Sequence, residues 1–406
     1  MIRFFLLVIV SSLICGIASL SANGPLSHRI TNAIPALERS NWNRKQVLKI
    51  FREEIFGIVP TVEDGGNTSF AIVSKNPKAL GGRATLFVLE VTFSATEQDS
   101  FSFPVRLFVP NNKRPVSTSP SNQQEEKNDC HPVFLFLCNR SEEEILGEDE
   151  NVSEYWPVEE IVASGFATAA VWAGDIDPDD QNDDFANGIH PLLDQGDFVR
   201  NDRSWGAIAA WAWGLSRILD VLEQGSKIFQ INPAKVCVIG HSRGGKTALW
   251  AAAQDERFAM AVSNNSGCTG AALSKRKACG KFGETVRQIN TVFPNWFCKR
   301  YRSYNDREYS LLVDQHMLLA LVAPRAISVA SATEDDWADP TGEYISLREA
   351  SKIWKDSPSL PKEQPPPEQP IDSGNIHYHL RSGPHDLNLY DWKQHMAAFQ
   401  RYIDNQ

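Results

Sequence analysis

The sequence of 406 residues has no excess of positive charge. Its 40 Lys and Arg residues and 50 Asp and Glu residues give a formal net charge of -10, which argues against a nucleic acid as a partner. Its seven cysteines contain no CxxC pair, and no other cluster of metal ligands stands out. We therefore expect no metal site. After the N-terminal apolar run, no segment looks like a membrane span.

The N-terminus has the pattern of a secretory signal peptide. Arg3 precedes an apolar run from Phe4 to Leu20, and small residues between Ala18 and Ala22 offer a cleavage site. We assign residues 1–22 to this signal and residues 23–406 to one folded domain. The protein is then exported, either to a periplasm or out of the cell, and is not attached to a membrane once the signal is removed.

The cysteines fit an exported protein but do not fix a disulfide pattern. Cys15 leaves with the signal, and a lipoprotein role for it is disfavoured because Ile14 is bulky where a small residue is expected. Six cysteines remain, and an oxidising compartment allows them to pair. Six cysteines permit fifteen complete pairings, so the sequence does not choose among them.

Apolar runs alternate with helical patterns along most of the chain. Two β-rich runs, TLFVLEVTF and FSFPVRLFVP, predict an antiparallel pair between Thr85 and Val109. Further strands are expected at 132–137, 165–173, 235–240, 258–267, 324–332 and 375–383, with a helix at 204–223. This order predicts an α/β fold, a three-layer sandwich around a mostly parallel sheet. Two polar, Pro-containing stretches are expected to be surface insertions, at about 111–130 and 357–370.

A G-x-S-x-G motif lies between a predicted strand and a predicted helix. The run KVCVIG ends at Gly240, Ser242 follows two residues later, and TALWAAAQ continues as a helix. This is the context of a nucleophile elbow, where glycines let the strand and the helix pass closely, and it predicts that the three-layer sandwich is an α/β-hydrolase fold. A lone motif of this kind is also an ordinary glycine-rich turn, but the flanking elements favour Ser242 as a nucleophile.

A serine needs a base, and in this fold the acid and the histidine come later in the chain. The strand AISVASA is followed by an acidic cluster at 334–336, and the strand HYHLRSG is followed by His385. We therefore expect His385 to be the base and the cluster to supply the acid. His377 and His379 alternate along a strand and are interpreted as packing residues, whereas His241 is expected to support the turn.

From about Trp156 to Trp392 the sequence resembles the glucuronoyl esterase family of carbohydrate esterases (family 15), in its bacterial branch. The resemblance rests on the order and spacing of seven blocks, VWAGDIDPDD, SWGAIAAWAWGLSRILD, VIGHSRGGKTALWAAAQDERFA, SNNSGCTGAALSKR, DQHMLLALVAPR, DDWADPTGE and GPHDL. It implies hydrolysis of the ester between 4-O-methyl-glucuronic acid on xylan and a lignin alcohol. The expected substrate is therefore glucuronoxylan or a lignin–carbohydrate ester. No metal or organic cofactor is implied.

The resemblance also assigns roles to side chains. Ser242 attacks the uronoyl carbonyl, His385 transfers the proton, Asp335 orients His385, and the Arg243 backbone N–H and guanidinium stabilise the oxyanion. Substrate-binding roles fall to Lys246, Glu284 and Trp337. Lys246 lies one helical turn past the nucleophile and is expected to reach sugar hydroxyls. Trp337 matches a sugar-contacting tryptophan, and Glu284 matches a sugar-binding glutamate.

The sequence departs from the family at one catalytic position. Many members carry a catalytic glutamate in an ESG pattern after the strand that follows the elbow, where this chain has Asn265-Ser266-Gly267. An asparagine does not stabilise an imidazolium as a carboxylate does. The acid role therefore passes to Asp335, a position that other members use, and whether Glu334 can substitute for it is left open.

Two other functions compete with the uronoyl esterase. One is another carbohydrate esterase, such as an acetyl xylan esterase, which would use the same three catalytic residues but would not need Lys246, Trp337 and Glu284. The other is a catalytically silent carbohydrate-binding protein on a hydrolase scaffold, which the serine, histidine and acid argue against. Kinetics on uronate esters and acetylated xylan separate the first two functions, and serine labelling tests the third.

Overall fold

The computed structural model describes residues 37–62, 65–112, 130–146, 153–182, 184–196, 198–277 and 283–406. One ten-stranded sheet runs through this part of the chain, in the order β1-β2-β3-β5-β4-β6-β7-β8-β10-β9. The strands are β1 (Asn67–Lys78), β2 (Ala84–Ser94), β3 (Ser100–Pro110), β4 (His131–Cys138), β5 (Ala167–Trp172), β6 (Ile231–His241), β7 (Met260–Asn264), β8 (Ala326–Ala332), β9 (Ile371–Ser373) and β10 (Ile376–Arg381). The neighbours from β5 to β10 pair in parallel, whereas β1 to β3 and β9 are antiparallel additions.

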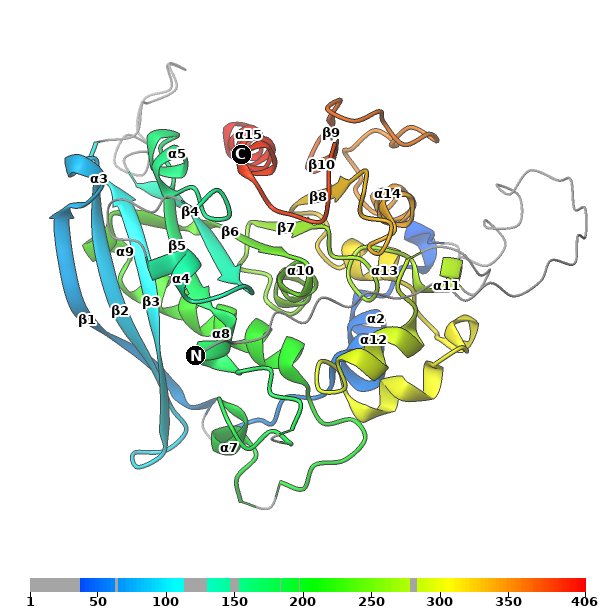
Figure 1. Ribbon diagram of the computed structural model, residues 1–406, viewed down its shortest axis with the longest axis horizontal. Helices are drawn as coiled ribbons and strands as arrows, with labels where there is room; N and C mark the ends of the chain where they lie inside the picture. Colours follow the sequence, from blue (N-terminus) through cyan, green and yellow to red (C-terminus); the bar gives the residue numbers. More distant parts are fainter. Residues whose placement is uncertain are drawn as a thin grey trace, which may run out of the picture.

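Helices cover both faces of the sheet (Figure 1). They are α2 (Arg44–Phe51), α3 (Ala79–Gly82), α4 (Glu143–Leu146), α5 (Val158–Ala163), α6 (Ala173–Ile176), α7 (His190–Leu193), α8 (Ala207–Gln224), α9 (Ser226–Phe229), α10 (Arg243–Gln254), α11 (Ser274–Lys277), α12 (Val286–Val292), α13 (Gln315–Ala320), α14 (Pro340–Ser351) and α15 (Leu389–Asp404). Shorter turns are η1 (Arg39–Asn41), η2 (Arg52–Phe56), η5 (Lys299–Tyr304) and η6 (Glu308–Ser310). None of the helices in the described ranges is long and apolar enough to cross a membrane.

The central strands are buried on both faces and separate two hydrophobic cores. Along β4, Leu135 and Leu137 join the core beneath α8 and α10, and the alternate residues Phe134 and Phe136 join the core beneath α5 and α15. This follows from the two-residue period of a strand, which sends successive side chains to opposite faces. Near-continuous apolar runs are therefore what a parallel sheet covered on both sides requires.

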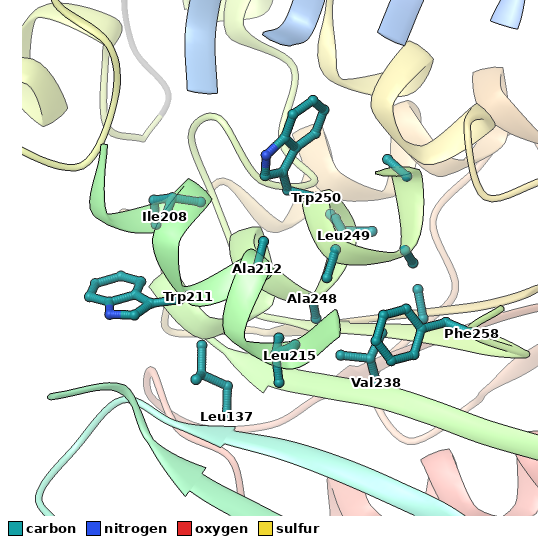
Figure 2. Close-up of a cluster of buried hydrophobic side chains, with 14 of the residues drawn as sticks. Leu137, Ile208, Trp211, Ala212, Leu215, Val238, Ala248, Leu249, Trp250 and Phe258 are labelled. Atoms are coloured by element: carbon teal, nitrogen blue, oxygen red, sulfur yellow. The ribbon is translucent and has the colours of Figure 1, made fainter. Parts of the chain in front are cut away.

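The larger core fixes the helix that follows the elbow. Figure 2 shows Ala248 and Leu249 of α10 near side chains of α8 and the sheet, whereas Trp250 points to the side of α10 away from the sheet. Trp250 is fully buried, and its ring stacks on Phe56 with centroids 4.3 Å apart. Because burying an aromatic side chain stabilises the fold by roughly 1.5–3 kcal/mol, α10 is held firmly, and the start of α10 is a stable base for the adjoining turn.

The predicted α/β-hydrolase fold is confirmed, including the antiparallel pair of β2 and β3 and the parallel strands that follow. The stretch 357–370 carries no helix or strand and is mostly exposed. Of the other predicted insertion, residues 113–129 lie outside the described ranges, as do the signal sequence, Cys15 and Cys279. The cysteines within those ranges are free thiols, at positions 130, 138, 237, 268 and 298.

Candidate active site

Ser242 occupies a sharp turn between β6 and α10. Its backbone angles are φ 56° and ψ -123°, a conformation that L-residues rarely adopt and that is retained where the surrounding structure enforces it. A Cβ atom on Gly240 would lie 2.2 Å from the carbonyl carbon of Gly244, so only glycine allows strand and helix to pass. The Ser242 N–H donates to the carbonyl of Asn264 at 2.9 Å, which ties the turn to the end of β7. The serine itself is half-buried.

Asp335 and His385 follow the ends of two adjacent parallel strands, β8 and β10. The segments beyond these strands are joined by backbone hydrogen bonds, because the N–H of Thr333 donates to Arg381 at 2.9 Å and the N–H of Glu334 donates to Gly383 at 3.0 Å. His385 Nδ1 then lies 2.6 Å from Asp335 Oδ2. The structure thus brings together an imidazole and a carboxylate that are fifty residues apart in the sequence.

The acidic cluster at 334–336 has one buried member. Asp335 is buried, whereas Glu334 and Asp336 are exposed. Burial raises the pKa of Asp335, but hydrogen bonds from His385 and Asn265 and the charge of His385 outweigh it, so the pKa lies below its usual value. Asp335 is therefore ionised at neutral pH and suited to orient an imidazole.

Asn265 supports the carboxylate from the side of β7. Its Nδ2 donates to Asp335 Oδ2 at 3.0 Å, and therefore the same oxygen faces both Asn265 and His385. The backbone of Asn265 has φ 45°, in the left-handed region that asparagine tolerates better than most residues. The departure from the family pattern noted in the sequence thus supplies a hydrogen-bond donor where a second carboxylate would otherwise stand.

His241 connects the His385 segment to the elbow. The two imidazole rings lie 4.4 Å apart between centroids, and His241 directly precedes Ser242. Burial, followed by the charge of His385, holds the pKa of His241 well below its usual value, so it stays neutral. Its Nδ1 lies 2.6 Å from Asn264 Oδ1. His241 thus acts as a buried spacer between the turn and His385, in keeping with its expected supporting role.

Arg243 begins α10, and its guanidinium contacts residues of three other segments of the chain. Nη2 donates to the carbonyl of Asn139 at 2.5 Å, Nε lies 3.8 Å from Asp179 Oδ2, and the guanidinium sits 5.9 Å from the Trp296 ring centre. Burial raises the pKa of Asp179 to about 6, although Arg243 opposes the shift. As the first residue of the helix, Arg243 also has a backbone N–H without an intrahelical acceptor, which is the usual oxyanion donor.

The three expected substrate-binding residues are placed differently from one another. Trp337 is 53% exposed, beside the Asp335 turn. Glu284 is buried, and its N–H donates to the carbonyl of Trp337 at 2.9 Å, which brings these two distant segments together. Lys246, which the sequence suggested would reach sugar hydroxyls, is buried. It is 4% exposed, and Nζ donates to the carbonyl of Ser266, because the first turn of α10 packs against the segment after β7.

Sequence reasoning missed Glu343, which supports the segment containing Asn265. Glu343 lies in α14, and its Oε1 accepts from the N–H of Gly267 at 2.9 Å while its Oε2 accepts from Ser331 at 2.6 Å. It is fully buried, and burial raises its pKa to about 8, so it is protonated at neutral pH. The family block DDWADPTGE ends at this glutamate, and that was the available signal.

The side chains gathered at the carboxyl edge of the sheet are those of serine hydrolases, a nucleophile on an elbow, a histidine and a buried carboxylate. Within the described ranges, no three His, Cys, Asp or Glu side chains are arranged to hold a metal ion. The fold and the elbow together define an α/β-hydrolase.

Comparison with known proteins identifies the family. A model of fungal glucuronyl esterases matches residues 181–357. A carbohydrate esterase of an unknown prokaryotic organism is 37% identical over 373 residues, covering 86% of this chain and 83% of that protein. The structure of a glucuronoyl esterase from Solibacter usitatus is 32% identical with a TM-score of 0.77, covering 89% of this chain and 93% of that one. The chain therefore belongs to the glucuronoyl esterases, carbohydrate esterase family 15, and is a carboxylic ester hydrolase.

Fungal relatives match a shorter part of the chain. The 4-O-methyl-glucuronoyl methylesterase of Neurospora crassa is 35% identical over 159 residues, which cover 38% of this chain and 40% of that protein.

Proposed function

We propose that the protein hydrolyses 4-O-methyl-glucuronoyl esters that link xylan to lignin alcohols, with Ser242, His385 and Asp335 as the catalytic residues. The observation that carries this proposal is the 2.6 Å contact between His385 Nδ1 and Asp335 Oδ2, beside an elbow that carries a half-buried serine. The substrate class is supported by the relatives named as glucuronoyl esterases and 4-O-methyl-glucuronoyl methylesterases.

The proposed reaction has two halves. Ser242 Oγ attacks the uronoyl carbonyl while His385 accepts the serine proton, and Asp335 stabilises the imidazolium that forms. Collapse of the tetrahedral intermediate breaks the bond to the alcohol, which leaves with the proton from His385. Water then attacks the acyl-enzyme with His385 again as base, and the uronic acid leaves as Ser242 regains its proton.

The oxyanion and the sugar are assigned to the residues around the elbow. The Arg243 backbone N–H and guanidinium stabilise the negative charge that develops on the carbonyl oxygen. The exposed indole of Trp337 stacks on the sugar ring, because an aromatic face fits the apolar face of a pyranose. Glu284 and Lys246 complete the substrate site by hydrogen bonds to sugar hydroxyls, which requires Lys246 Nζ to exchange its bond with Ser266.

We also propose that the protein is exported after removal of residues 1–22. The sequence pattern of this segment supports the proposal. Protein sequencing of the mature N-terminus tests it, because a start between residues 19 and 23 is expected, and an N-terminus that still carries Arg3 would contradict export by cleavage.

Kinetics on a panel of esters test the function. Methyl and benzyl esters of glucuronic acid, each with and without the 4-O-methyl group, are compared with acetylated xylan. The proposal expects uronate esters to have the higher kcat/KM and Ser242→Ala to abolish turnover. A preference for acetylated xylan would assign the protein to another carbohydrate esterase activity, and no labelling of Ser242 by a serine-directed phosphonate would assign it to the catalytically silent class.

A further inference from the structure

Arg381, the last residue of β10, turns its guanidinium onto the segment that carries His385. Nη1 donates to the carbonyl of Ser382 at 2.9 Å, and Nη2 donates to the carbonyls of Pro384 and Asp386 at 2.9 and 3.1 Å. Two of these carbonyls flank His385, so one side chain holds the backbone on both sides of the imidazole. The rigid planar fork of arginine makes several such bonds at once, which a lysine ammonium does not.

The guanidinium is itself held by a buried ion pair. Arg381 Nε lies 3.0 Å from Asp391 Oδ2, and the two side chains are 6% and 0% exposed. The same carboxylate oxygen accepts from the N–H of Asn388 at 3.1 Å, at the start of α15. The pair therefore fastens both ends of the His385 segment, the end of β10 and the beginning of α15. A buried pair of this kind is strongly unfavourable to break, because the remaining charge is left without a partner.

The other oxygen of Asp391 is contacted by one buried histidine, which is contacted in turn by a second. His379 Nε2 lies 2.9 Å from Asp391 Oδ1, and His379 Nδ1 lies 3.2 Å from His377 Nε2. A carboxylate only accepts hydrogen bonds, so His379 donates to Asp391 through Nε2. His377 Nδ1 lies 2.7 Å from Asp372 Oδ1, so the series ends at an exposed carboxylate. These strand histidines, interpreted from the sequence as packing residues, thus orient the carboxylate that holds Arg381.

The segment carrying His385 has little packing of its own. Ser382, Pro384 and His385 are exposed, and Gly383 has φ 110°. Exposed segments with few buried contacts open readily. Catalysis requires the imidazole of His385 to stay at its hydrogen-bonding position beside Asp335, because misplacement of a catalytic group by about 1 Å costs on the order of 100-fold in rate.

We propose that Arg381 is a positioning residue for His385. Through its three carbonyl contacts and its ion pair with Asp391, it holds the imidazole where it meets Asp335 and Ser242. The inference rests on the function proposed above, because Arg381 acts on catalysis only through His385.

Arg381→Lys tests the inference directly, and Arg381→Met is its companion. Lysine keeps the charge beside Asp391 but loses the fork, so the ion pair is retained while the carbonyl contacts are not all made. We expect kcat per active serine, counted by complete phosphonate labelling, to fall roughly 10- to 100-fold with KM within about twofold. The far-downfield proton resonance of the short His385–Asp335 hydrogen bond, identified by its loss in Asp335→Asn, should weaken in both variants.

Arg325→Met is the matched control. Arg325 also donates to several backbone carbonyls, those of Ala252, Asp255 and Phe258 among them. It directly precedes β8, so it lies at the amino end of that strand, whereas Asp335 follows the carboxyl end. The Arg325→Met substitution should lower the melting temperature and leave both kcat and the downfield resonance near their wild-type values. Wild-type kcat in Arg381→Lys, or an equal loss of kcat in Arg325→Met, would overturn the positioning role.

The rate constant of phosphonate labelling separates this inference from the proposed function. If the wild-type protein hydrolyses no uronate ester, the substrate proposal fails, but labelling of Ser242 still depends on His385. Slower labelling in Arg381→Lys than in Arg325→Met then supports the positioning role, and equal labelling rates contradict it whatever the natural substrate.

Discussion

Asn265 and His385 contact the same oxygen of Asp335, at 3.0 and 2.6 Å, from the ends of β7 and β10. The carboxylate is thus held between an amide that only orients it and an imidazole whose charge it can stabilise. This arrangement keeps the pKa of Asp335 low in spite of its burial. Within the described part of the chain, Asp335 is also the one carboxylate in contact with His385, so substitutions at this residue test the acid function directly.

Asp335→Asn should reduce kcat by roughly 10⁴-fold with little change in KM, because the amide removes the charge and favours the wrong imidazole tautomer. Steady-state kinetics on methyl glucuronate measure the effect. Glu334→Gln and Asp336→Asn are matched controls, since both side chains are exposed neighbours, and they should retain near-normal kcat. Near-normal activity in Asp335→Asn would reject its role, and a large loss in Glu334→Gln would transfer the role to that residue.

Asn265→Glu should restore part of the activity lost in Asp335→Asn. The side chain at position 265 already points at the oxygen that faces His385, and a glutamate is one methylene longer than the asparagine. We expect the double variant to exceed Asp335→Asn by roughly tenfold in kcat, within the usual range of a general-base contribution. The gain is limited because a glutamate is less tolerant of the left-handed backbone at φ 45°. The double variant Asn265→Gln with Asp335→Asn is the control, and equal rates in the two would contradict a carboxylate effect.

The stability of Glu343→Gln relative to the wild type should increase as the pH rises. The pKa of Glu343 is raised from 4.5 to about 8, so between these values the unfolded chain loses a proton that the folded protein keeps. Folding stability therefore falls with pH in the wild type, by at most about 1.4 kcal/mol per pH unit from this group. The difference in melting temperature between variant and wild type should grow from pH 5 to pH 8 and then level off. A difference that is constant across this range would show that Glu343 is ionised in the folded protein.

Trp337→Ala should raise KM for uronate esters several-fold and leave the melting temperature near wild type. The indole is 53% exposed, so its removal creates no cavity in the core, whereas the loss of a stacking face weakens sugar binding. Comparing kcat and KM on benzyl glucuronate with those on a simple acetate ester isolates the effect. An equal loss on both substrates would assign Trp337 to the integrity of the Asp335 turn instead.

The sequence was informative where local patterns carry the structure. The apolar runs of β4 to β8 and β10 and the glycines around Ser242 have local signatures, and the order of acid and histidine follows from the fold. It was uninformative for β1, whose residues are largely exposed and do not alternate. Contacts made by buried polar side chains across long separations were also missed, because nothing near Glu343 or Arg381 in the sequence indicates which partner each one meets. The burial of Lys246 depends on such a contact, with Ser266.

The chain between β8 and β10 leaves and returns at neighbouring strands, carrying α14, the proline-rich stretch 357–370 and β9 on the way. Backbone hydrogen bonds join the two ends of this excursion, from Thr333 to Arg381 and from Glu334 to Gly383, and they hold the catalytic acid and base side by side. The excursion also bonds back to the catalytic segments, because Glu343 accepts from the N–H of Gly267 at 2.9 Å and Glu368 accepts from the N–H of Ser382 at 2.8 Å. Insertions or deletions within it are therefore expected to affect the rate as well as the surface.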